Sequence, residues 1–186
     1  VGISPYEILN LKAGSTVAGS HNLLFLPYLL GERTPYWNPN ARGAFVGLTR
    51  GHKREDLTRA VLEGAIFGLR TVVDTFTEQG VTIDEVRVIG GTARGRLFCQ
   101  IQADVFQRSI LRPHTLEEAT SLGAAIAGGI GVGIFKDFLV AEELVNIADV
   151  FKPRQQEGEH YQKLYDVFKN TYQALVPIYD QLAKLG

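Results

Sequence analysis

The stretch that decides the fold reads Gly43-Ala44-Phe45-Val46-Gly47-Leu48, continues through a mostly polar spacer and ends in Asp56-Leu57-Thr58-Arg59-Ala60-Val61-Leu62-Glu63. We interpret the first piece as an alternating strand, and the second has apolar residues at helical spacing. The helical pattern extends over Arg54–Gln79, with apolar or small residues at intervals of three and four. It predicts a strand followed by a long amphipathic helix whose charged side chains, including Arg59 and Glu63, lie on the face away from the core.

Beyond this helix, short β-branched runs alternate with further helical patterns. This order is typical of a helix-rich α/β domain with too few strands for a complete sheet. Thr115 and Glu118 have the spacing of a capping box and predict a helix start there. The other expected elements are a buried extended segment at Leu23–Leu30, strands at Val86–Ile89 and Ser109–Leu111, and helices at Gly95–Gln107, Ala141–Ile147 and Glu157–Leu185.

A glycine-rich turn, Gly90-Gly91-Thr92-Ala93-Arg94-Gly95, separates a predicted strand from a predicted helix. Such a turn suits phosphate or nucleoside binding, because helix N–H groups and a closely approachable backbone are presented together. The dinucleotide fingerprint does not match, since Thr92 replaces a glycine, and Arg96 and Leu97 replace the Lys and Ser/Thr of a P-loop. From these residues alone, a tight turn without any ligand is an equally good interpretation.

Length and composition suit one globular domain over residues 1–186, with a formal net charge of −1. This charge predicts no general attraction to nucleic acid or to an anionic membrane, and no apolar run is long enough to span a bilayer. The single cysteine, Cys99, fits a reducing cytoplasm and is expected to be a packing residue. The four histidines have no metal-ligand spacing. The chain contains no methionine, so we expect it to be part of a longer protein.

Several motifs, taken in order, resemble the FGGY family of carbohydrate kinases. Gly43–Glu63 is similar to the signature of its C-terminal domain, and Gly31-Glu32-Arg33-Thr34-Pro35 is similar to the segment before it. Gly90-Gly91 with Gln100-x-x-Ala103-Asp104 resembles the family's adenosine motif, although Asp104 itself is expected to make a structural hydrogen bond. Leu122-Gly123-Ala124-Ala125 resembles its closing helix of small residues.

The resemblance implies a ribonuclease-H-like (actin-like ATPase) C-terminal domain that lacks its first strands. It also implies that ATP contacts Gly90, Gly91, Thr92 and Gly95. Gly95 departs from the pattern, because xylulose kinases usually have Ser and glycerol kinases Asn at this place. By resemblance, the complete protein transfers the γ-phosphate of Mg-ATP to a sugar hydroxyl. The general base, the Mg²⁺ site and the sugar pocket are then outside this chain, which contributes no catalytic residue and no metal ligand and is expected to be inactive alone.

The expected substrate is inferred from the loop before the signature, by its resemblance to the corresponding loops of family members. Gly31-Glu32-Arg33-Thr34-Pro35 favours xylulose kinase, while Tyr36-Trp37-Asn38-Pro39 is also similar to gluconate and glycerol kinases. Xylulose is therefore our first expectation and gluconate the second. A non-catalytic interaction domain with the same fold is an alternative of a different class, and the intact Gly90-Gly91 turn disfavours it. The expected partners are the sugar, ATP and an N-terminal kinase domain, and the sequence leaves a homodimer open.

Overall fold

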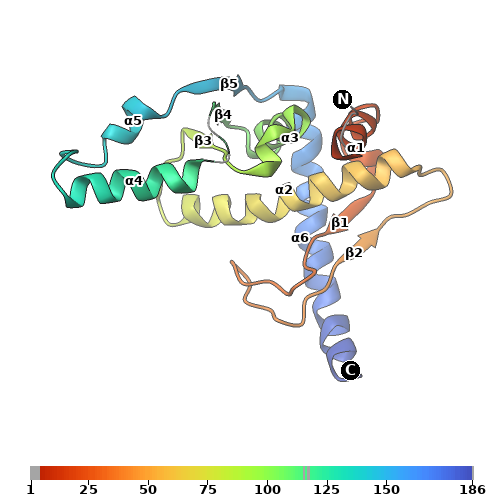
Figure 1. The fold of residues 1–186 in the computed structure, drawn as a ribbon. Helices are drawn as coiled ribbons and strands as arrows, with labels where there is room; N and C mark the ends of the chain where they lie inside the picture. The colour runs from red at the N-terminus through yellow and green to blue at the C-terminus, as the bar shows by residue number, and fades with distance from the viewer. Residues whose placement is uncertain (1–4, 115, 117, 186) are drawn as a thin grey trace.

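A computed structural model describes residues 5–114, 116 and 118–185. Short strands are interspersed among longer helices along the chain, as Figure 1 shows. In order, the elements are α1 (Pro5–Gly14), the 3-10 turn η1 (Ser20–Asn22), β1 (Leu24–Leu26), β2 (Ala44–Val46), α2 (Arg54–Glu78), β3 (Glu85–Arg87), the 3-10 turn η2 (Gly91–Arg94), α3 (Arg96–Phe106), β4 (Ser109–Pro113), α4 (Ala119–Gly131), α5 (Val140–Leu144), β5 (Ile147–Phe151) and α6 (Gln155–Ala183).

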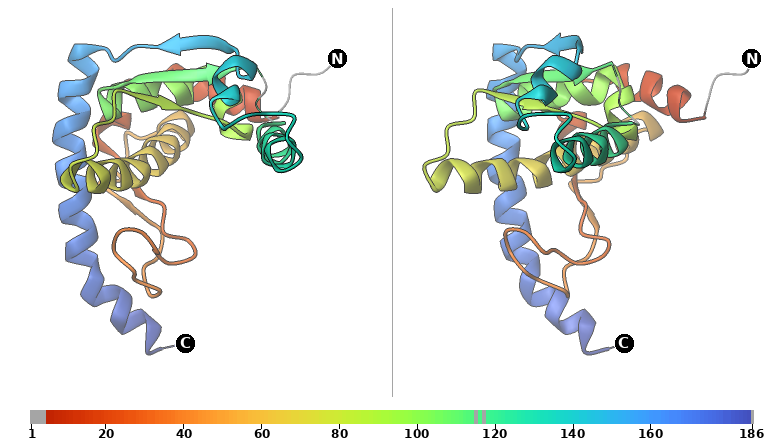
Figure 2. Two further views of the ribbon diagram at one scale, coloured as in Figure 1. Left: turned by 90° about the vertical axis from the view of Figure 1, so that its left-hand side faces the viewer. Right: turned by 60° about the vertical axis from the view of Figure 1, so that its left-hand side comes forward.

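The strands form two small sheets. β1 and β2 pair antiparallel, with Phe25 opposite Phe45, and β3, β4 and β5 form a three-stranded sheet in that order. β3 runs parallel to β4, whereas β5 is antiparallel to β4 and places Asp149 opposite Arg112. The β3–β4–β5 sheet lies along one side of the molecule in both views of Figure 2. Because β3 and β4 are parallel, their C-terminal ends lie at the same edge of the sheet. Ligand-binding loops commonly follow this edge in such sheets.

The core lies where α2, α3 and α6 meet. α6 crosses α2, and its C-terminal end projects beyond the other elements (Figure 1). Phe67 of α2 contacts three rings of α6, with centroids 5.4 Å from Phe168, 5.9 Å from Tyr165 and 6.0 Å from Tyr161. All four side chains are almost completely buried. This aromatic stripe on α6 is the one that its sequence periodicity predicts.

Most expected helices are confirmed, with ends that shift by no more than three residues. The helix expected at Ala141–Ile147 is partly wrong, because α5 ends at Leu144 and Ile147 begins strand β5. Residues 147–151 alternate between half-buried and exposed before Phe151 is buried, which is a strand pattern. The expected capping box falls on Thr115, which lies outside the described residues, and α4 begins only at Ala119.

Arg59 and Glu63 correct our prediction for the polar face of α2, because both are buried, with exposures of 4% and 2%. Their burial is compensated by pairing, with Arg59 Nε 2.7 Å from Glu63 Oε1. Glu63 also accepts hydrogen bonds from the Gly19 N–H at 2.9 Å and the Tyr161 hydroxyl at 2.6 Å. Burial, followed by the nearby Glu63 charge, raises the pKa of Tyr161 and keeps its hydroxyl a donor. Conversely, Phe76 on the predicted apolar stripe is 53% exposed.

None of the described helices combines the length and the apolar character needed to cross a bilayer.

Candidate nucleotide-binding site

The glycine turn lies between β3 and α3, as its sequence predicts. Gly90 has φ +85° and ψ −177°, a conformation that is open essentially only to glycine. The Ala93 N–H donates to the Gly90 carbonyl at 3.1 Å and the Gly95 N–H to the Thr92 carbonyl at 3.1 Å, which closes η2. The Gly90 N–H itself donates to the Leu116 carbonyl at 3.0 Å. The turn is therefore ordered by its own backbone and by the segment that leads into α4.

The space above the turn is open. A Cβ built on Gly90 or on Gly91 would meet no atom within 4 Å, and Gly91 and Thr92 are exposed. At Gly95 the nearest atom to such a Cβ is Asn10 Nδ2 at 3.4 Å. The backbone conformation explains a glycine at position 90 but not at position 91, where φ lies outside the left-handed range. The four residues expected to contact ATP therefore form one surface segment with free space over its first half.

The N-terminus of α3 adds backbone donors to this surface. Gly95 is the N-cap residue, and no side chain caps the helix. The first N–H groups of such a helix have no intrahelical acceptor, and their dipoles favour negative or polar ligand atoms. The turn and the start of α3 thus present backbone groups rather than side chains.

Charged side chains border the far end of the turn. Asp149 of β5 receives Arg96 Nη1 at 2.6 Å and Arg112 Nε at 2.9 Å. Arg112 also donates from Nη1 to the Arg94 carbonyl at 3.4 Å. Hydrogen bonds from Arg96 and then Arg112 hold the pKa of the Asp149 carboxyl below its usual value, so the carboxylate stays charged at neutral pH.

Asp104 and Cys99 of α3 both have the structural roles that the sequence predicts. Asp104 is completely buried and accepts hydrogen bonds from the Arg154 N–H at 2.8 Å, from Arg154 Nη2 at 2.6 Å and from Gln100 Nε2 at 3.0 Å. The expected structural hydrogen bond of Asp104 is thereby confirmed. Cys99 is also completely buried, and this burial raises the pKa of its thiol. Its expected packing role is confirmed, because a raised pKa opposes the thiolate form that a nucleophile needs.

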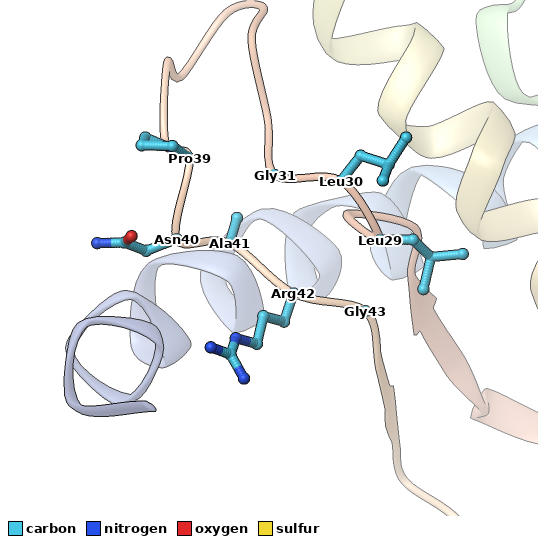
Figure 3. Close-up of a pocket in the computed structure, with 8 residues that line it drawn as sticks. All are labelled: Leu29, Leu30, Gly31, Pro39, Asn40, Ala41, Arg42 and Gly43. Atoms are coloured by element: carbon cyan, nitrogen blue, oxygen red, sulfur yellow. The ribbon is translucent and has the colours of Figure 1, made fainter. Parts of the chain in front are cut away.

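Two hollows lie elsewhere on the chain. One, of about 500 Å³, is bordered by the arms Leu29–Gly31 and Pro39–Gly43 of the loop between β1 and β2. Figure 3 shows these arms running beside α6, to which Asn40 is tied through Asp180 at 3.0 Å and Arg42 through the Leu182 carbonyl at 3.4 Å. The other, of about 530 Å³, is lined by residues of α1, α2, α3 and α6 and by the segment after α1. Neither is lined by Gly90–Gly95, so we base the nucleotide site on the turn's backbone geometry rather than on cavity size.

Metal-ligating side chains do not gather in the described part of the chain. Within residues 5–114, 116 and 118–185, no three His, Cys, Asp or Glu side chains are close enough together to hold a metal ion.

Comparisons with known proteins converge on one family. Residues 5–132 match the model of the FGGY family of carbohydrate kinases, C-terminal domain. The chain is 37% identical over 184 residues to a gluconokinase of Bacillus licheniformis, covering 98% of this chain and 36% of that protein. It is 38% identical over 167 residues to a xylulose kinase of Staphylococcus epidermidis, covering 89% of this chain and 33% of that protein.

Solved structures agree with this assignment. The ligand-bound xylulose kinase from Lactobacillus acidophilus superimposes with a TM-score of 0.87 at 31% identity, over 95% of this chain and 36% of that one. The glycerol kinase of Plasmodium falciparum with ADP gives a TM-score of 0.74 at 25% identity, over 91% of this chain and 34% of that one. The chain thus spans about a third of the length of the relatives it matches. Its fold is that of the C-terminal, actin-like ATPase domain of these kinases, and the chain belongs to the FGGY family of carbohydrate kinases.

Proposed function

We propose that this chain is the nucleotide-binding portion of an ATP-dependent carbohydrate kinase. The observation that carries the proposal is Gly91. Neither its backbone conformation nor its packing requires a glycine, because an added Cβ would meet nothing within 4 Å. A glycine is needed at such a place when something outside the chain approaches the backbone closely. The chain's family and the ADP in a related glycerol kinase structure support adenosine as that ligand.

In this proposal the chain binds and orients the nucleoside and leaves the chemistry to another domain. Gly90–Thr92 would lie against the adenosine, while the first residues of α3, after Gly95, would offer uncapped N–H groups to its polar atoms. Phosphoryl transfer also needs Mg²⁺ on the phosphates and a base beside the attacking hydroxyl. By the family resemblance, we assign Mg²⁺, the base and the sugar pocket to an N-terminal kinase domain that partners this one.

For the substrate we propose xylulose, with gluconate as the second candidate. Relatives named for the two sugars are almost equally identical to this chain, at 38% and 37%. The loop residues that favour xylulose set the path of the backbone and do not bind the hydroxyl groups of the sugar. A Cβ on Gly31, for example, would lie 2.9 Å from the Pro39 carbonyl oxygen. Discrimination between sugars comes from hydrogen bonds that a wrong sugar leaves unmade, and those partners would belong to the N-terminal domain.

Steady-state kinetics of the complete kinase test the assignment. We expect the highest kcat/KM for xylulose among xylulose, ribulose, gluconate and glycerol at saturating Mg-ATP, and only background ADP release from residues 1–186 alone. A tenfold preference for gluconate or glycerol would overturn the choice of xylulose and leave the kinase proposal standing (a tenfold ratio is about 1.4 kcal/mol). If the complete protein bound no ATP, a non-catalytic interaction domain would become the better interpretation.

A further inference from the structure

Three charged side chains close around the C-terminal end of the glycine turn, and we call them the turn clasp: Arg96, Arg112 and Asp149. The two carboxylate oxygens of Asp149 are divided between the arginines, with Oδ1 2.6 Å from Arg96 Nη1 and Oδ2 2.9 Å from Arg112 Nε. Arg112 uses a further nitrogen, Nη1, to reach the Arg94 carbonyl at 3.4 Å. The clasp joins the end of η2, the start of α3 and the paired strands β4 and β5.

The clasp holds both neighbours of Gly95. Arg94, just before it, is held through its carbonyl oxygen, and Arg96, just after it, through its guanidinium. Packing restrains the first half of the turn little, because Gly91 and Thr92 are exposed and a Cβ on Gly90 or Gly91 would touch nothing. Ala93 is the buried anchor inside the turn. The backbone hydrogen bonds of the turn and the Leu116 carbonyl order its first part, and the clasp acts at its C-terminal end.

We propose that Asp149 and Arg112 are positioning residues for nucleotide binding, which fix the conformation of the Gly90–Gly95 turn without touching the nucleotide. This inference rests on the proposed function of the turn. Asp149 orients Arg112, Arg112 holds the Arg94 carbonyl, and that carbonyl sets the path of the backbone into Gly95. The strand β5 thereby contributes to nucleotide affinity, although its residues lie outside the motifs that resemble the family.

Direct contact of the two arginines with the phosphates is the alternative role. It is less consistent with the geometry, because the Asp149 carboxylate already pairs with both guanidinium groups and would repel a phosphate beside them. The two roles make different predictions. A positioned turn affects the nucleoside, so adenosine and ATP should weaken together. An arginine on a phosphate affects ATP alone, and its contribution should fall with added salt.

The test uses the complete kinase with Asp149→Asn or Arg112→Gln. Arg87→Gln is a matched control, since Arg87 lies on neighbouring β3 and pairs with Glu85 at 3.5 Å, outside the clasp. Both clasp variants should raise the KM for ATP about fivefold, the size usual for residues that act through a neighbour, and raise the inhibition constant of adenosine by the same factor. The kcat and the KM for the sugar should stay within about twofold, and the double variant should add little to either single variant.

Each other outcome is decisive. A raised KM for ATP with an unchanged inhibition constant for adenosine would overturn positioning in favour of phosphate contact. Unchanged constants for both ligands in folded variants would show that the clasp does not act on the site. If Arg112→Gln fails to fold, Arg96→Gln replaces it, because the Arg96 side chain is 67% exposed. A wild-type kinase that binds neither adenosine nor ATP would overturn the proposed function itself. If the wild-type kinase binds both, the clasp variants alone decide the positioning role.

Discussion

Gly64 on α2 and Gly91 in the turn are the same residue type in opposite surroundings. A Cβ on Gly64 would lie 2.0 Å from the Phe25 carbonyl oxygen, so β1 and α2 could not keep their present distance. A Cβ on Gly91 would meet nothing within 4 Å. The first glycine is explained by the chain's own packing. No contact within the chain explains the second, and its place in the turn between β3 and α3 makes it the candidate for a close approach by a ligand.

Glu63, which precedes Gly64, and Asp149, beside the glycine turn, are carboxylates that differ in the same way. Glu63 is 2% exposed and is surrounded by donors from η1, α2 and α6, including the Ser20 hydroxyl at 2.8 Å. The Asp149 side chain is 22% exposed and meets its two arginines at the surface. Removing one partner of a buried ion pair leaves the other charge without any solvent to hydrate it. At the surface, water can take the place of the lost partner. Changes around Gly64 should therefore lower stability, and changes around Gly91 should alter binding.

The largest effect should follow from Glu63→Gln. This change leaves the Arg59 guanidinium buried without a counter-charge, and such a loss destabilises a fold by about 3–5 kcal/mol. Urea unfolding of the two proteins measures the difference. Glu78→Gln is the control, because Glu78 is exposed near the end of the same helix and its replacement should change stability by less than about 0.5 kcal/mol. Equal unfolding midpoints for Glu63→Gln and the wild type would contradict the role of the buried network.

A smaller loss should follow from Gly64→Ala. The new methyl group must push α2 away from the Phe25 carbonyl, and overpacking of this kind usually destabilises by about 1–3 kcal/mol. Gly68→Ala is a matched control one turn further along. Its Cβ would meet Pro27 Cγ at an ordinary 3.5 Å, so the higher helix propensity of alanine should stabilise by up to about 1 kcal/mol. Changes of the same sign in both variants would show that close packing does not distinguish the two glycines.

These comparisons show what the sequence could and could not predict. The periodicity of α2 and α6 predicted both helices, because long amphipathic patterns average over many residues. The same rule assigned Arg59 and Glu63 to solvent, since residue type alone does not reveal a partner such as Tyr161, which comes from α6. Their spacing of four residues was the available signal, because it allows an Arg–Glu pair on one helix.

The candidate site, like the fold, was predicted only in part from the sequence. The position of Gly90–Gly95 between a strand and a helix is confirmed, and the φ of Gly90 explains one of its glycines. The clasp was not predicted, because the first residue of β5 was assigned to a helix and the rest to no element, and its pairing with β4 joins segments far apart in the sequence. Strand pairing depends on such long-range contacts, which local propensity does not encode. The β-branched and aromatic residues Ile147, Val150 and Phe151 were the available sequence signal for β5, whereas its alternation is seen only in the burial pattern.

A binding effect rather than a stability effect should follow from Gly91→Val in the complete kinase. The branched side chain would fill the space above the turn without touching the fold, so we expect the KM for ATP to rise about tenfold or more while the KM for the sugar is unchanged. The unfolding midpoint should shift by less than that of Gly64→Ala. A stable variant with an unchanged KM for ATP would remove Gly91 from the nucleotide site and with it the contrast between the two glycines.

The smallest expected effect is the pH dependence of the Asp149 contribution to stability. The arginines lower the pKa of this carboxyl in the folded protein, so its stabilisation is fully present above its unfolded pKa, near 3.9, and is lost as the pH falls through the folded value. The difference in melting temperature between the wild type and Asp149→Asn, which cannot titrate, should therefore be constant between about pH 5 and about pH 8 and shrink below about pH 4.

Added salt should reduce the same difference, because the Arg96 side chain is exposed to the counter-ions. The Gly64 and Glu63 variants should lose stability to the same extent at low and high salt, since their contacts are buried. A melting difference for Asp149→Asn that ignores salt and instead changes between about pH 5 and about pH 8 would contradict the lowered pKa. It would also place Asp149 with the buried network of Glu63 rather than with the surface of the glycine turn.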